Sequence, residues 1–199
     1  MRTAFRIILV LLGLMTVPFT ANREPLSEQP VEEFIEPGPI SVYDEMIRSA
    51  SDAAGVDWRL VAAIIYHESR FHISASSDRG ATGLMQVRSA RYEPDSLLDP
   101  ATNLQVGTRY LRRMQKMFSP MAADTLECLK FALAAYNAGE GKMLRNIENA
   151  EARGLDGSRW DEIIKLSPGG PSNATKAYVE GVLDKYREYA LLFPSTSSK

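Results

Sequence analysis

The chain has 199 residues, and 45% of them are hydrophobic, which suits one globular domain with short extensions. Its formal net charge is −2 and it carries no long basic run, so nucleic acid is excluded as an expected partner. The single cysteine, Cys128, rules out an intrachain disulfide and a cysteine-based metal site, and its apolar neighbours predict a small buried residue.

The N-terminal segment has a short cationic start followed by an apolar run. Arg2 and Arg6 precede the largely apolar residues 7–19, a pattern typical of a secretory signal. This run is short for a membrane span, which needs about 20 residues. Ala21 is a candidate last residue of a cleaved signal, but the residue two positions before it is not small, so an uncleaved anchor stays open. We therefore predict a signal peptide or N-terminal anchor over 1–21, and membrane contact only through an uncleaved N-terminus.

Residues 22–39 interleave four prolines with five glutamates. Proline blocks regular backbone pairing, and glutamates that repel one another stay solvated. This segment is therefore predicted to be an extended acidic linker.

From Ser41 onward the apolar spacing predicts helices joined by short loops. Ser41 followed by Asp44 resembles a capping box, and Asp57, Asp99 and Asp124 are candidate N-caps. We expect helices over 41–54, 57–69, 100–118, 124–138, 140–154 and 173–192. Because no stretch alternates like a strand, residues 40–192 are predicted to form one all-α domain, followed by a disordered tail over 193–199.

Glu68 is the first residue that could carry chemistry. It follows Ile64 and Ile65 by four and three positions, which places it on or beside the buried stripe of its helix. Burial raises the pKa of a carboxyl group, and an acid protonated near neutral pH can protonate a glycosidic leaving oxygen. On position alone, the favoured alternative is a helix-terminal carboxylate with its head in solvent.

Two further motifs contain groups that suit sugar binding. Gly83 allows close backbone approach, and Gln86 offers an amide donor and acceptor. Tyr136 and Asn137 stand at the end of a helix that Gly139 closes, where they could present a hydroxyl and an amide to a cleft. Each motif alone is explained equally well by a loop that leads into a helix, or by a helix C-terminus.

The order of the motifs is more specific than any one of them. Glu-Ser at 68–69, Gly-Leu-Met-Gln at 83–86, Ala-Ala-Tyr-Asn-Ala-Gly at 134–139 and Ala-Tyr-Val at 177–179 together resemble the catalytic domain of the lytic murein transglycosylases. Longer stretches resemble the membrane-bound type F enzymes, namely 57–71, 98–114, 130–143 and, more weakly, 154–168. The resemblance runs from about residue 43 to 189 and implies the goose-lysozyme-like SLT fold with a substrate groove.

The resemblance also implies roles for single residues. Glu68 matches the family's catalytic glutamate, and Tyr178 matches a tyrosine that faces that glutamate. The residues that the resemblance matches to substrate binding in the groove are Ser77, Gly83, Met85, Gln86, Tyr136, Asn137 and Tyr178 itself. Two positions depart from the common pattern: Arg88 stands where many relatives have methionine, and Ala174 where an acidic residue is common.

The reaction that the resemblance implies uses one carboxyl group, no cofactor and no metal. Glu68 protonates the oxygen that links N-acetylmuramic acid to N-acetylglucosamine, then takes the proton of the C6 hydroxyl as a 1,6-anhydro ring closes. His67 and His72 are interpreted as surface or groove-edge residues, because no metal-ligand spacing accompanies them.

Two alternatives remain open at this point. A lysozyme-type hydrolase on the same fold would need a second acid, for which Glu140 is the nearest candidate. A non-catalytic peptidoglycan-binding or secretion-assembly protein could keep the groove without activity. The expected partner is the peptidoglycan glycan strand, an envelope or secretion machine is a further candidate, and the expected location is the periplasm or cell envelope.

Overall fold

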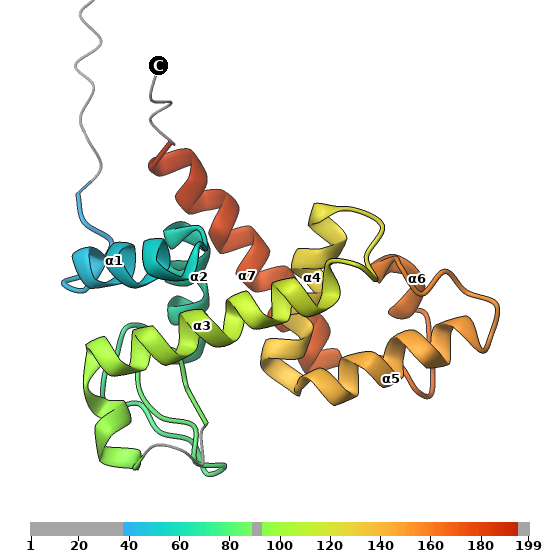
Figure 1. The fold of residues 1–199 in the computed structure, drawn as a ribbon, viewed down its shortest axis with the longest axis horizontal. Helices are drawn as coiled ribbons and strands as arrows, with labels where there is room; N and C mark the ends of the chain where they lie inside the picture. Colours follow the sequence, from blue (N-terminus) through green and yellow to red (C-terminus); the bar gives the residue numbers. More distant parts are fainter. Residues whose placement is uncertain (1–37, 89–92, 195–199) are drawn as a thin grey trace, which may run out of the picture. The chain divides into compact units, whose positions relative to one another are not determined.

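The computed structural model describes residues 38–88 and 93–194. The predicted signal or anchor, almost all of the predicted linker and most of the predicted tail lie outside these residues. The described chain is helical and holds no strand, only isolated bridges, so the all-α fold class is confirmed. The elements, labelled in Figure 1, are α1 (Asp44–Ala54), α2 (Trp58–Ser69), η1 (Pro94–Leu98), α3 (Pro100–Phe118), α4 (Thr125–Ala138), α5 (Glu140–Glu151), α6 (Trp160–Ile163) and α7 (Asn173–Leu192).

Aspartate side chains begin three helices as predicted. Asp57, Asp99 and Asp124 each accept backbone hydrogen bonds from the first turn of α2, α3 and α4. The predicted start at Ser41 is wrong. α1 begins at Asp44, whose carboxylate accepts a hydrogen bond from the backbone N–H of Ser41 in the turn before the helix.

Smaller corrections concern single residues. Cys128 is half-buried rather than buried, and its thiol donates to the carbonyl of Gln115 of α3 at 3.3 Å. Phe193, assigned to the tail, instead packs its ring edge against Trp58, with 5.3 Å between centroids. The short helices η1 and α6 were not expected.

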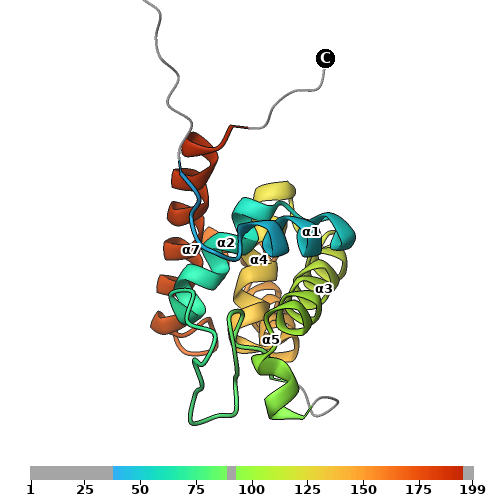
Figure 2. The ribbon, with the colours of Figure 1, turned by 90° about the vertical axis from the view of Figure 1, so that its left-hand side faces the viewer.

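The middle of α2 is completely buried. Its residues 60–65 are all apolar and each is at most 2% exposed, so this helix is covered on every side. α2 packs against α7 and α1, while α3 packs against α1 and α4, and α4 also packs against α7 (Figure 2). The last turn of α2 and the second turn of α7 are thereby brought together although more than 100 residues separate them in sequence.

None of the helices described here is both long and apolar enough to cross a membrane. Within the same residues, no group of three or more histidine, cysteine, aspartate or glutamate side chains could hold a metal ion.

Candidate active site

Glu68 lies in the last turn of α2, directly opposite a tyrosine of α7. The hydroxyl of Tyr178 donates a hydrogen bond of 2.7 Å to Oε1 of Glu68. The helix ends at Ser69, and the left-handed backbone of the next residue, Arg70 (φ 51°), turns the chain away. The buried Ser69 hydroxyl donates to the carbonyl of Leu84 at 2.8 Å, which ties the end of α2 to the following loop. The position of Glu68 is thus fixed by α7 through Tyr178 and by the following loop through Ser69.

The surroundings of Glu68 favour its protonated form. Burial is the largest effect and raises the pKa of Glu68 to about 7, although the hydrogen bond from Tyr178 and the positive charge of Arg88 act in the opposite direction. Its side chain keeps partial exposure, so solvent and substrate can reach it. Burial also raises the pKa of Tyr178 well above its ordinary value, with the Glu68 charge adding to the effect, so the phenol remains a donor.

The loop over 82–87 is held by α3. Asn103, which is fully buried, accepts from the backbone N–H of Met85 and donates to the carbonyls of Thr82 and Leu97, each at 2.8 Å. Gly83 has φ +78°, and a Cβ there would lie 2.3 Å from Nδ2 of Asn103. Glycine is therefore required by both the backbone conformation and the close approach.

Gln86 and Met85 are held by contacts within the protein. Both amide hydrogens of Gln86 are used within the loop, because Nε2 donates to the carbonyls of Ala75 and Gly83 at 3.0 Å. Met85 is fully buried. What Gln86 can still offer a ligand is its side-chain oxygen.

Tyr136 joins α4 to this loop. Its hydroxyl donates to the carbonyl of Met85 at 2.8 Å, and its ring contacts that of Tyr110, with 5.4 Å between centroids. The next residue, Asn137, accepts a hydrogen bond from the buried Thr175 hydroxyl of α7 at 3.1 Å. The end of α4 is thus fixed to both the loop and α7.

Ser77 is the one predicted site residue on an exposed turn. Its hydroxyl accepts from the backbone N–H of Ala81 at 3.0 Å, within the turn itself. No hydrogen bond found among the described residues joins it to Glu68.

Both carboxylate oxygens of Glu140, the candidate second acid, accept hydrogen bonds from other side chains. Its Oε2 accepts from the hydroxyl of Tyr110 at 2.9 Å and its Oε1 from Arg113 at 2.7 Å. The first backbone N–H of α5 is the main cause that lowers the pKa of Glu140, followed by the Tyr110 hydrogen bond. It is an ionised carboxylate with both oxygens engaged, which does not suit a free general base.

Asn103 and Thr175 were not predicted from the sequence. A usable signal exists for Asn103, because it shares one helix face with Gly107 and Leu111, and a polar residue in a buried stripe must find partners. The Thr175 contact carries no such signal, since it depends on how α7 crosses α4.

The sequence and the fold of this chain match those of a known family. Residues 45–156, more than half of the chain, match the Transglycosylase SLT domain family. The membrane-bound lytic murein transglycosylase F of Ectopseudomonas mendocina is 34% identical over 129 residues, or 63% of this chain and 26% of the relative. The Vibrio cholerae protein of that name is 38% identical over 119 residues, 58% of this chain and 22% of the relative. The chain therefore spans about a quarter of the length of these relatives.

Solved structures give the same result. The 70 kDa soluble lytic transglycosylase SLT70 from Escherichia coli superposes with a TM-score of 0.62 and 27% identity, covering 78% of this chain and 25% of that one. An inactive mutant of the lytic transglycosylase Slt from Pseudomonas aeruginosa gives a TM-score of 0.58 and 26% identity over 75% of this chain and 24% of that one. The chain belongs to the transglycosylase SLT domain family and has its lysozyme-like helical fold.

Proposed function

We propose that this protein is a lytic transglycosylase that cuts peptidoglycan glycan strands between N-acetylmuramic acid and N-acetylglucosamine and leaves 1,6-anhydro ends. The observation that carries the proposal is the Glu68 carboxyl group, with its pKa raised to about 7 and Tyr178 hydrogen-bonded to one oxygen. The relatives named as lytic murein transglycosylases support the same reaction.

In the proposed reaction Glu68 acts first as acid and then as base. Its proton moves to the bridging oxygen as the bond from that oxygen to the muramoyl C1 breaks, and the 2-acetamido carbonyl of the same sugar stabilises the cationic centre. The ionised carboxylate, stabilised by the Tyr178 hydroxyl, then takes the proton of the C6 hydroxyl while the C6 oxygen bonds to C1. Glu68 ends protonated, ready for another cycle.

The other matched residues are proposed to bind the glycan. Ser77 and the side-chain oxygen of Gln86 would contact sugar groups, and Tyr136 and Asn137 would line the groove. Gly83 and Met85 would shape its floor from below, consistent with their tight packing.

The decisive experiment is digestion of purified sacculi followed by mass spectrometry of the products. We expect 1,6-anhydromuramoyl ends, lighter by one water than reducing ends, and a loss of at least about 10²-fold in rate for Glu68→Gln, because glutamine cannot cycle a proton.

Glu140→Gln is the matched control for this experiment. It removes the only other carboxylate considered for catalysis, and its rate should stay within a few-fold of the wild type. Reducing ends together with inactivity of Glu140→Gln would make the protein a hydrolase instead.

We further propose that residues 1–21 are a signal peptide or anchor, 22–39 a linker and 40–192 the catalytic domain, and that the protein works in the cell envelope. The relatives named membrane-bound support that location. The intact mass of the protein recovered from an envelope fraction tests this organisation: loss of the first 21 residues indicates cleavage, and a full-length mass in the membrane pellet indicates an anchor.

A further inference from the structure

The last turn of α2 carries a second titratable side chain next to Glu68. His67 is half-buried, and its ring meets two tyrosine rings edge to face. The centroid of Tyr178 lies 6.3 Å away at 74°, and that of Tyr66 lies 5.5 Å away at 76°. The first of these is the tyrosine that donates to Glu68, so the imidazole contacts a partner of the reacting carboxyl group.

The surface of α7 is shaped to receive this imidazole. Gly181 follows Tyr178 by three residues, on the same face of the helix. A Cβ at position 181 would lie 2.5 Å from Cε1 of His67 and within 3.3 Å of both ring nitrogens. Only glycine therefore lets the ring lie directly against the α7 backbone one turn beyond Tyr178.

Charges around the imidazole favour its neutral form. Burial lowers the pKa of His67, and the positive charges of Arg70 and Lys185 add to this effect, while an interaction with the Gly181 backbone opposes it. A neutral ring can pack between the helices without placing a positive charge beside Tyr178.

We propose that His67 is a positioning residue: seated on Gly181, its ring fixes the ring of Tyr178 and thereby the hydrogen bond from Tyr178 to Glu68. The role rests on the proposed function. Without His67 the phenol can swing away from Oε1. The ionised carboxylate then loses its donor, which raises the pKa of Glu68 further and slows the step in which Glu68 gives its proton to the leaving oxygen.

A double-mutant cycle tests the proposal. His67→Ala, Tyr178→Phe and the double variant are compared for kcat, KM and the pH at which the rate falls. For His67→Ala we expect kcat to fall roughly tenfold with KM nearly unchanged, since a misplacement of about 1 Å can cost up to about 10²-fold. The alkaline fall should move to higher pH, as in Tyr178→Phe.

Non-additivity separates positioning from general packing. If His67 acts through Tyr178, His67→Ala costs little more once Tyr178→Phe is present. Equal costs in both backgrounds, or an unmoved pH profile, would overturn the proposal. Gly181→Ala, which displaces the imidazole from the other side, should behave like His67→Ala and provides a second route if the first variant folds poorly.

Two controls complete the design. His72→Ala removes the only other histidine, which is exposed, and should leave the rate and its pH profile unchanged. His67→Phe keeps a neutral ring and should restore most of the rate. NMR titration of the Glu68 carboxyl group without substrate measures its pKa and does not depend on activity. The product analysis therefore tests the proposed function, and the titration tests the positioning role of His67 separately.

Discussion

At the scale of single residues, Glu68 shows what sequence position could and could not predict. Its place three and four residues after buried isoleucines indicated a desolvated carboxyl group, but a solvent-facing head explained the same position. The structure resolves this because α7 brings Tyr178 to it across 110 residues of sequence. No local pattern encodes that contact, and only the ordered set of motifs anticipated it.

The rate should follow the protonation of Glu68. The acid must be protonated to start the reaction, and burial raises its pKa to about 7, so activity should be full well below pH 7 and fall as the pH rises through that value. Arg88 favours the ionised form, so Arg88→Met should move the fall to higher pH. Initial rates measured between pH 5 and 9 check this.

Arg145→Met is a suitable control for the Arg88 variant. Arg145 is exposed on α5 and is not among the charges that act on Glu68. The two variants should differ in their pH profiles. Identical profiles would mean that Arg88 does not act on Glu68.

At the scale of elements, the loop over 82–87 depends on polar anchors inside the helices that hold it. Asn103 of α3 holds the 82–87 loop, and Gly107, one turn later, lets Met85 lie against the helix, since a Cβ there would come within 2.5 Å of its sulfur. The Met85 carbonyl in turn accepts from Tyr136. The loop is therefore part of the helical core.

Asn103→Leu should both destabilise the fold and weaken activity. It removes three hydrogen bonds and leaves buried carbonyls and an N–H without partners, a cost of about 2–4 kcal/mol in the free energy of unfolding. Urea denaturation measures it. Asn149→Leu, which loses one exposed hydrogen bond to Gly169, should cost less than about 1 kcal/mol; similar losses for the two variants would contradict the anchor role.

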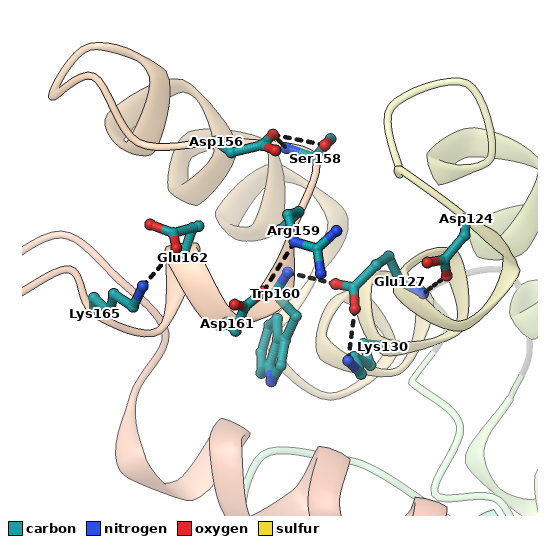
Figure 3. A network of polar contacts seen from close by, with 10 residues as sticks. All are labelled: Asp124, Glu127, Lys130, Asp156, Ser158, Arg159, Trp160, Asp161, Glu162 and Lys165. Atoms are coloured by element: carbon teal, nitrogen blue, oxygen red, sulfur yellow. Dashed lines mark hydrogen bonds and ion pairs between the residues drawn. The ribbon is translucent and has the colours of Figure 1, made fainter.

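A second anchor ties α4 to the short helix α6. Glu127 is only 4% exposed; one of its oxygens accepts from the backbone N–H of Trp160, the first residue of α6, and the other from Lys130 (Figure 3). The N-cap residue of α6 itself, Arg159, makes no side-chain capping hydrogen bond. A carboxylate at a helix N-terminus is favourable, so α4 supplies the cap that α6 lacks.

Glu127→Gln should therefore loosen α6. Glutamine carries no negative charge, so the half-buried Lys130 loses its counterion and the Trp160 N–H loses an ionic acceptor. We expect a loss of about 2–4 kcal/mol in the free energy of unfolding. Glu162→Gln is the matched control in the same network, because its ion pair with Lys165 lies at the surface and contributes less than about 1 kcal/mol. Equal losses in urea denaturation would contradict the cap.

At the scale of the whole molecule, the long helices could be predicted and the short ones could not. α2, α3 and α4 combine an aspartate cap with several turns of apolar periodicity, and their starts agree with the prediction. α6 has four residues, too few to show a period, and its cap comes from another helix. Contacts with distant parts of the chain determine whether such short helices form, so the local sequence does not predict them.

The described residues also contain a core of their own. The buried apolar residues run from Ile47 to Tyr189, so residues 38–194 should fold alone. Removing 1–37 should change Tm by less than about 2 °C, which corresponds to less than roughly 1 kcal/mol for a domain of this size, and should leave the rate on sacculi unchanged. Calorimetry and product analysis check both. A clearly lower Tm would place part of the stabilising contacts before residue 38, whereas an unchanged Tm with loss of envelope localisation would assign that segment to targeting alone.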